Sequence, residues 1–177
     1  MIRVVHFIHG LNMGGAETLV KNYALLLDKS KFNVTVLCYT RCDSPYETIL
    51  QQNNIPVVYL CDEMPFYEKT GLIAKLVNRF QRYWLVRREL QQLDPDIVHF
   101  HLSLSDYVRF SGLKKSVKLF YTQHFSAEVW KSENASDIQN LKWLMKHYQV
   151  QPIALNASMC DSMNKILQTD NTKILNN

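Results

Sequence analysis

The sequence predicts an α/β fold, a Rossmann-like doubly wound parallel sheet between two helical layers, formed as a single three-layer domain by all 177 residues. Three observations predict it. Short apolar segments alternate with amphipathic ones, as in successive βαβ units. Several of the short segments are apolar throughout, which is typical of parallel strands covered on both faces. A chain of this length also buries about 70% of its unfolded surface, enough for a core without disulfides.

The first part of the chain contains three strand signals and two helix signals. A first strand is expected over residues 3–8, and a helix over 16–28 whose apolar residues recur at helical spacing on one face. A valine-rich segment predicts a second strand over 33–39. A short helix beginning at a proline follows over 45–53, and a third strand over 56–60.

The middle of the chain continues the alternation. A long helix is expected over 71–93, and an Asp-Pro pair ends it. Strands over 97–101 and 118–122 enclose a helix over 106–113. Each strand is again short and largely apolar, so these segments extend the same sheet.

The last part of the chain adds a helix over 140–148 and a strand over 151–155. A further helix is expected over 158–168, with Asn156 or Ser158 as its N-cap. The segment 172–175 resembles the beginning of one more strand.

Composition limits the function. The apolar fraction of 47% and charged fraction of 20% are those of a globular protein. The net charge of +4 permits an anionic partner, but no basic tail or run of five like charges favours nucleic acid. No apolar run reaches the roughly 20 residues that span a bilayer, and no signal peptide is evident. The four cysteines form no C-x-x-C pair, so we expect reduced thiols in a cytoplasmic protein.

A glycine pair, Gly14 and Gly15, separates the first strand from the first helix. Glycine lets a phosphate approach the backbone closely, and the N–H groups and dipole at a helix start attract negative charge. The pair lacks the G-x-G-x-x-G spacing of dinucleotide sites and the G-K-[ST] ending of a P-loop. A tight turn alone explains the glycines equally well.

Polar side chains lie at the ends of three of the predicted strands or just past them. They are His9, Asn12, His99, His101, Gln123 and His124. Because the carboxyl ends of parallel strands meet at one edge of a sheet, we expect them to gather beside the glycine pair. Histidine both donates and accepts hydrogen bonds, which suits phosphate or polyol groups. We interpret His6 and His99 as packing residues, and we expect no metal site, since no H-x-x-x-H or H-E-x-x-H helix occurs.

In order along the chain, several segments resemble family-four glycosyltransferases of the GT-B fold. The opening strand, loop and helix, VHFIHGLNMGGAET over residues 5–18, is similar to the start of that family. FNVTVL (32–37) and NIPV (54–57) resemble its second strand and the approach to its third. DPDIVHFH (94–101) and TQH (122–124) resemble its histidine-bearing strand and the histidine after strand five. The similarity covers nearly the whole chain.

The resemblance implies two Rossmann-like domains that face each other across a cleft. Residues 1–177 would form the amino-terminal, acceptor-side domain. The donor-binding carboxyl-terminal domain, with its basic residue and paired glutamates, would be absent, so we expect this chain alone to be inactive. The family implies transfer of a sugar from a nucleotide-sugar to a saccharide or polyprenyl-linked acceptor, usually retaining and without a bound metal or cofactor. Polysaccharide or capsule synthesis would be the setting.

The resemblance also implies roles for individual residues. Gly14 and Gly15 match the loop that meets the donor diphosphate. His124 matches the catalytic-site histidine near the transferred sugar. Glu17 matches a family glutamate whose role we leave open. Asn12 and His101 are expected as acceptor contacts.

Two alternatives to a transferase remain open from the residues. One is a non-catalytic module that binds a phosphorylated sugar or nucleotide, and the other is a GT-B nucleotide-sugar epimerase.

The helix over 71–93 is also open to two interpretations. Its apolar stripe packs on the sheet with Lys75, Arg79 and Arg82 opposite in solvent, or the basic amphipathic helix lies on an anionic bilayer, as in a peripheral protein at the inner face of a membrane.

Overall fold

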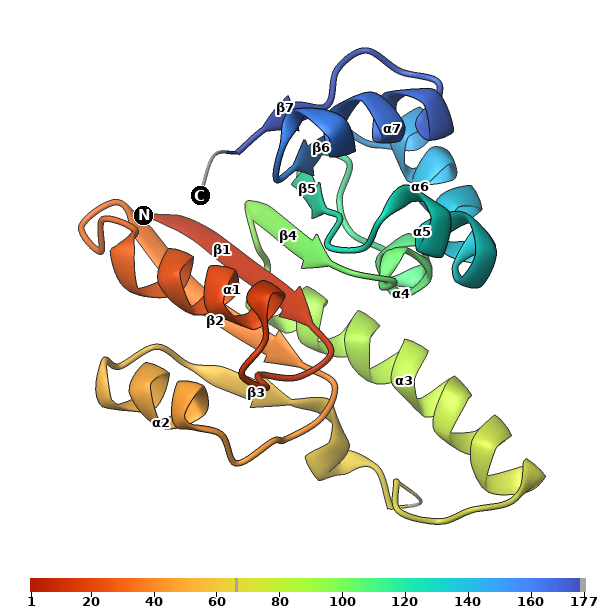
Figure 1. Cartoon of the computed structure of the whole chain (residues 1–177). Coiled ribbons are helices and arrows are strands. Elements are labelled where there is room, and N and C mark those ends of the chain that lie inside the picture. Colours follow the sequence, from red (N-terminus) through yellow and green to blue (C-terminus); the bar gives the residue numbers. More distant parts are fainter. Residues whose placement is uncertain (66, 176–177) are drawn as a thin grey trace.

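The computed structural model describes residues 1–65 and 67–175, and it confirms the predicted fold class (Figure 1). The strands are β1 (Ile2–Ile8), β2 (Phe32–Cys38), β3 (Val57–Tyr59), β4 (Ile97–His101), β5 (Lys118–Thr122), β6 (Val150–Ala154) and β7 (Lys173–Ile174). Within the described ranges they form one parallel sheet in the order β3-β2-β1-β4-β5-β6-β7. The order reverses between the central strands β1 and β4, and such switch points are where doubly wound folds bind ligands.

Helices connect the strands as right-handed crossover units require. They are α1 (Gly15–Leu26), α2 (Pro45–Gln52), the 3₁₀ helix η1 (Leu60–Glu63), α3 (Leu72–Leu93), α4 (Ser105–Phe110), α5 (Ala127–Glu133), α6 (Ala135–His147) and α7 (Ala157–Leu167). The structure confirms the expected strands to within about two residues, and β4 and β5 have the predicted bounds.

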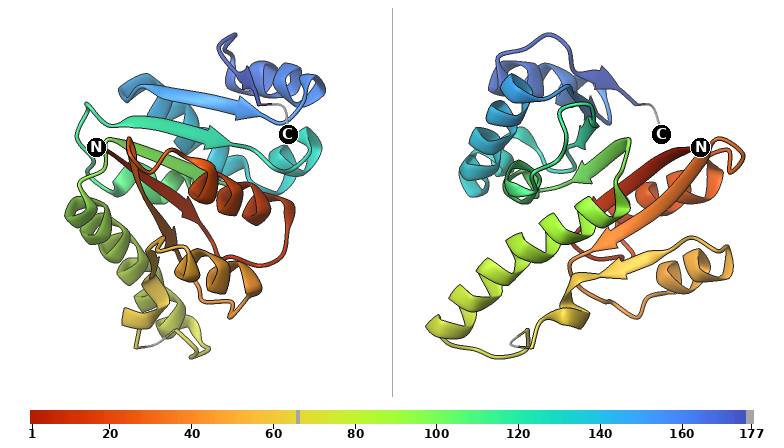
Figure 2. Two further views of the ribbon diagram at one scale, coloured as in Figure 1. Left: turned by 90° about the vertical axis from the view of Figure 1, so that its left-hand side faces the viewer. Right: turned by 180° about the vertical axis from the view of Figure 1, so that it is seen from behind.

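The sheet separates two apolar cores, because successive side chains of a strand point to opposite faces. On β1, Val4 and Ile8 pack with α1 and α2, whereas Val5 and Phe7 pack with the helices of the other face. The views in Figure 2 show the resulting three layers, with α1 and α2 on one side of the sheet. The predicted three-layer arrangement is therefore confirmed.

The region between β5 and β6 differs from the prediction. A single helix was expected over 140–148, but α6 begins at Ala135 and is preceded by α5. The short α5 segment carries little apolar periodicity, whereas Ile138, Leu141 and Leu144 of α6 recur on one helical face and are buried. The α5 segment is instead held by Trp130, which is fully buried.

A buried carboxylate ties this region together. Asp137 of α6 accepts hydrogen bonds from the backbone N–H of Ser105 (3.0 Å), the hydroxyl of Tyr121 (2.9 Å) and the indole N–H of Trp130 (3.1 Å). These donors come from α4, β5 and α5. Burial raises the pKa of Asp137, and the three donors oppose that shift. Long-range contacts of this kind are invisible in local sequence, which is why the early start of α6 was missed.

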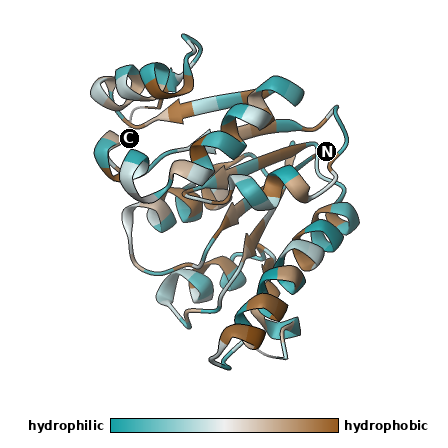
Figure 3. Ribbon diagram, turned by 90° about the vertical axis from the view of Figure 1, so that its right-hand side faces the viewer, coloured by the Kyte–Doolittle hydropathy of each residue, from teal (hydrophilic) through white to brown (hydrophobic). Residues whose placement is uncertain are grey.

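Only the carboxyl-terminal half of α3 packs on the sheet, through Leu85, Val86 and Leu90. The amino-terminal half extends beyond the sheet, as Figures 1 and 3 show. Its large apolar side chains are exposed. Together with Trp84 they form what we call the α3 stripe; the exposed fractions are Leu72 82%, Ile73 80%, Leu76 57%, Phe80 73% and Trp84 59%. The packed interpretation of this helix is therefore wrong for its first half.

The cations of α3 also differ from the prediction. Arg82 does not lie free opposite the stripe, because its guanidinium stacks on the Tyr39 ring, 4.9 Å from the ring centroid. Lys75 and Arg79 are exposed, and Arg79 follows Leu72 by seven residues, which places it beside the stripe. No helix within the described residues is long and apolar enough to cross a membrane.

The four cysteines are free thiols, as predicted.

Candidate functional site

The glycine pair lies at the head of α1. Gly14 is the N-cap residue in an extended conformation, and it has no side chain with which to cap the helix. Thr18 makes the first helical hydrogen bond, to the carbonyl of Gly14 (2.9 Å), so the amides of residues 15–17 precede the helical ladder. The hydrogen bonds found among the described residues include none to these three amides. Gly15 has open space where a Cβ would stand, so a ligand can approach the backbone there.

One side chain lies across this loop. The Glu17 carboxylate folds back onto Gly14, so closely that a Cβ on Gly14 would collide with it. A carboxylate in the first turn of a helix interacts favourably with the helix dipole. Glu17 thus covers the Gly14 side of the loop and leaves the Gly15 side accessible.

The beginning of the loop is held by the segment between β2 and α2. Gly10 packs so tightly that a Cβ there would lie 2.7 Å from Sγ of Cys42 and 2.8 Å from Cγ2 of Thr40. Ser44 donates its hydroxyl hydrogen bond to the carbonyl of Leu11, and the same hydroxyl caps α2 in a capping box with Glu47. The loop is therefore anchored at its start and exposed at Asn12 and Met13.

His124 lies at the same edge of the sheet, because it follows β5 and all the paired strands are parallel. The side-chain carbonyl of the preceding residue, Gln123, accepts hydrogen bonds from the backbone N–H of His124 (2.9 Å) and of Phe125 (3.4 Å). Gln123 is itself buried. Neighbouring strands lie about 4.8 Å apart, so the carboxyl ends of β1 and β5, which flank β4, lie on the order of 10 Å apart.

Three histidines connect the interior to this edge. Nδ1 of His6 lies 3.4 Å from Nε2 of His101, and Nδ1 of His101 lies 3.3 Å from Nε2 of His124. We call these three residues the histidine file. His6 and His101 are buried, and His124 is half-buried. Burial lowers the pKa of His6 and of His124 to about 4, and the pKa of His101 well below its ordinary value.

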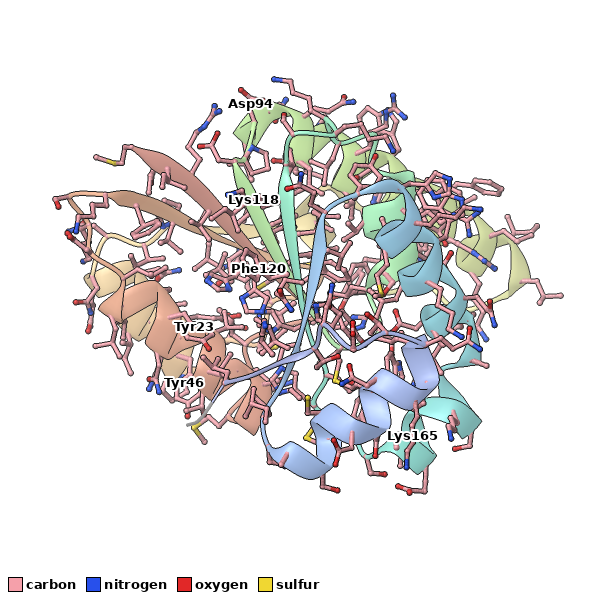
Figure 4. The ribbon with its side chains drawn as sticks, turned by 90° about the horizontal axis from the view of Figure 1, so that it is seen from above. Tyr23, Tyr46, Asp94, Lys118, Phe120 and Lys165 are labelled. Atoms are coloured by element: carbon pink, nitrogen blue, oxygen red, sulfur yellow. The ribbon has the colours of Figure 1, made fainter. Side chains whose placement is uncertain are left out.

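His99 lies beside the file rather than in it. Its Nε2 pairs with the hydroxyl of Thr122 at 2.7 Å, and its ring lies 4.1 Å from that of His101 between centroids. Burial lowers the pKa of His99 well below its ordinary value, so it is neutral. On the same face, Tyr23 of α1 stacks on His6 at 5.8 Å. Figure 4 shows Tyr23 and, on β5, Phe120, which line an apolar groove together with His6 and His99.

The residues best placed to bind a metal are also histidines. His6, His99 and His101 each offer one ring nitrogen, and these nitrogens lie within 4.8 Å of one another. Zinc bound at 2.0–2.1 Å would draw them closer together. Nδ1 of His6, Nε2 of His99 and both ring nitrogens of His101 already make hydrogen bonds, so a metal that used any of these atoms would compete with those bonds. The expectation of no metal stays a prediction.

The structure places the predicted residues unequally. Gly14, Gly15, Glu17, Asn12 and His124 all lie at the carboxyl edge of the sheet, and Asn12 is exposed. The expected acceptor contact by His101 stays a prediction, but this residue is fully buried, and its Nδ1 lies 3.3 Å from Nε2 of His124. The reason is that a side chain of β4 at this position turns under the edge, toward the α1 face.

Sequence reasoning missed three supporting residues. Gln123 holds the backbone of His124, Ser44 holds the glycine loop, and His6 is part of the histidine file rather than a simple packing residue. The sequence did carry a signal for the histidine file. His6 lies on the same face of its strand as Val4 and Ile8, and His99 and His101 lie on one face of theirs, so contacts between these histidines could have been expected.

Residues 13–174 match the family model of Glycosyltransferase Family 4. Among solved structures, Anabaena HepE in complex with UDP and glucose is similar, with a TM-score of 0.66 and 16% identity over 100% of this chain and 44% of HepE. The lipopolysaccharide outer core galactosyltransferase WaaB, in its apo form, gives a TM-score of 0.63 and 16% identity over 99% of this chain and 44% of WaaB. Acinetobacter baumannii MurG gives a TM-score of 0.54 and 13% identity over 90% of this chain and 42% of MurG.

At these identities the structural likeness concerns the fold. The chain spans about 44% of the length of HepE and of WaaB. No match is found among curated proteins.

Proposed function

The chain belongs to Glycosyltransferase Family 4, and from this premise we propose that it is the amino-terminal, acceptor-side domain of a GT-B glycosyltransferase. The enzyme would move a sugar from a nucleotide-sugar to a saccharide or lipid-linked acceptor, in a retaining and metal-independent reaction. The observation that carries this proposal is the meeting of the glycine loop and His124 at one edge of the sheet. HepE has been solved with UDP-glucose, which supports a nucleotide-sugar as donor.

The chemical task of such an enzyme is the departure of a nucleoside diphosphate as negative charge builds on its oxygens. Fixed N–H groups aimed at that charge stabilise the transition state without reorganising. The amides of Gly15 and Ala16 would supply part of this stabilisation. His124, at the same edge of the sheet, would lie beside the sugar attached to the diphosphate.

A second domain is part of the proposal. HepE and WaaB are each more than twice as long as the stretch that this chain matches. We propose that a donor-binding domain of comparable size supplies the basic residue and paired glutamates of the family, and that it closes over the edge bearing His124. The setting would be polysaccharide or capsule assembly on the cytoplasmic side.

The test is an assay of nucleoside diphosphate release with the 177-residue chain and with the enzyme that includes the donor domain. We expect activity only from the second. In that enzyme, His124→Ala should lower kcat by about 10²-fold, the effect of losing one donor at a site of developing charge. His147→Ala, at the exposed end of α6, is the matched control. Transfer by the chain alone, or an epimerised sugar as the product, would contradict the proposal.

We also propose that the α3 stripe contacts a membrane surface. Five large apolar side chains are exposed on one side of α3, with Lys75 and Arg79 beside them. Apolar side chains flanked by cations are typical of helices that lie in an anionic lipid interface. The helix follows β3 and runs back toward the start of β4, so its free end is near the carboxyl edge of the sheet. That position supports a lipid-linked acceptor delivered at the level of His124.

A further inference from the structure

The tautomers of the three residues in the histidine file depend on one another. A neutral imidazole has one N–H and one lone pair, on different nitrogens. The lowered pKa values of all three residues keep them neutral near pH 7. Each nitrogen–nitrogen contact needs one N–H and one lone pair, so the tautomer of one histidine sets the tautomer of the next.

Two arrangements satisfy both contacts. In the first, Nδ1–H of His6 donates to His101 and Nδ1–H of His101 donates to His124, which leaves His124 with its own proton on Nδ1. In the second, every proton lies on Nε2 and the direction is reversed. The arrangements differ at the buried end of the file, which is Nε2 of His6.

The buried end decides between them. Nε2 of His6 is buried, and the described part of the chain offers it no hydrogen-bond partner. The first arrangement leaves a lone pair at this atom, and the second leaves an N–H group. Buried N–H groups without a partner are rarer in proteins than buried acceptors that lack one. The first arrangement is therefore favoured.

We propose that His6 and His101 are positioning residues that hold His124 in its Nδ1–H tautomer, with that N–H directed away from the file. His124 then offers a hydrogen-bond donor to an oxygen atom of a bound ligand, of the class found on a sugar hydroxyl or phosphate. The identity of that ligand rests on the proposed function, but the tautomer does not.

The same geometry limits proton transfer. If the Nδ1 proton of His124 left, protons could move from His101 to His124 and from His6 to His101, but His6 would then have none. Its other nitrogen is buried among the described residues without a partner to replace the proton. The file therefore fixes a tautomer and does not conduct protons, and His124 acts as a donor rather than as a general base.

The test uses the whole chain labelled with ¹⁵N-histidine, without any ligand, and long-range ¹H–¹⁵N correlation spectra near pH 7.5. We expect His124 to show a protonated Nδ1 and an unprotonated Nε2. In His101→Phe the donor to Nε2 is lost, and the Nδ1 resonance should shift toward the unprotonated range. The control His147→Gln, at an exposed site outside the file, should leave the His124 resonances unchanged.

Two further variants keep the test decisive if His101→Phe does not fold. His6→Phe removes the donor to His101 and should give a mixture of tautomers at His124, whereas His6→Gln retains an N–H donor and should restore the wild-type pattern. A protonated Nε2 in wild-type His124, or a pattern unaffected by His6→Phe, would overturn the proposal. Because the readout is spectroscopic, a failure here is distinguishable from a failure of transfer in the assay of the complete enzyme.

Discussion

The carboxylate of Glu17 lies over the backbone of Gly14, at the position that a Cβ atom on residue 14 would occupy. A negative charge therefore already interacts with the first turn of α1. A diphosphate that reaches the same amides must either displace this side chain or bind beside it, on the open side at Gly15.

Glu17→Gln should therefore strengthen anion binding to the chain. Removing the charge frees a helix-dipole interaction of about 0.3–1 kcal/mol for the anion, so inorganic pyrophosphate should bind about 2- to 5-fold more tightly. Titration calorimetry at low ionic strength measures this. Glu68→Gln, an exposed site with the same charge change, is the control. Equal gains in both variants would show that only net charge matters.

Gly10→Ala and Gly14→Ala should have unequal effects on the free energy of unfolding. At Gly10 the new methyl group meets Cys42, Thr40 and the carbonyl of Thr40, so overpacking should cost about 1–3 kcal/mol. At Gly14 it meets only the end of the flexible Glu17 side chain, which can turn away, and the cost should be about 1 kcal/mol or less. Urea unfolding of both variants measures the difference. Similar losses would contradict the tight packing of Gly10.

Asp137→Ala should be strongly destabilising. The substitution leaves the donors of Ser105, Tyr121 and Trp130 buried without their acceptor, and each unsatisfied group costs about 1–3 kcal/mol. We expect a loss of at least about 3 kcal/mol in the free energy of unfolding, measured in urea. Tyr121→Phe removes one donor cleanly and should cost about 1 kcal/mol. If Asp137→Ala costs no more than Tyr121→Phe, the carboxylate does not hold the four elements together.

The chain should become less stable in mild acid. The ordinary histidine pKa is 6.5, whereas burial lowers those of His6 and His124 to about 4 in the folded chain. Between pH 6.5 and 4 the unfolded chain binds more protons than the folded one. The stabilisation is therefore full above pH 6.5 and is lost as the pH falls toward 4.

Each such histidine contributes a slope of about 1.4 kcal/mol per pH unit in that window. His6→Phe should reduce the slope of unfolding free energy against pH by about this amount, measured by urea unfolding from pH 7 to 4.5. His147→Gln serves as the exposed control. An unchanged slope in His6→Phe would mean that His6 takes up a proton in the folded state.

The α3 stripe should govern binding to anionic vesicles. Replacing Leu72, Ile73 and Phe80 with glutamine should abolish most sedimentation with vesicles that contain phosphatidylglycerol, because these side chains supply the apolar contact. Leu26→Gln, on α1 and 82% exposed, is the matched control. Lys75→Gln with Arg79→Gln should weaken binding by about 1 kcal/mol for each charge. Binding that persists in the triple glutamine variant would count against the proposal.

Much of the fold could be predicted because it is encoded locally. The apolar runs of β4 and β5 have the predicted bounds, and the glycine pair and His124 lie at one edge because parallel strands share their direction. What sequence reasoning missed depends on contacts between distant segments. Asp137 ties the first turn of α6 to α4, β5 and α5, and the burial of His101 depends on which face of β4 lies under α1. The exposed half of α3 was missed because a stripe of apolar residues looks the same whether it packs on a sheet or extends past it.

The anchoring of Leu11 by Ser44 has a consequence for recognition. A loose glycine-rich segment would have to be immobilised by its ligand, and that loss of freedom would weaken binding. Here the Ser44 hydroxyl at the start of α2 immobilises the segment during folding, before any ligand binds. Affinity at the loop can therefore be changed by substituting Ser44, which lies between β2 and α2 rather than in the loop itself.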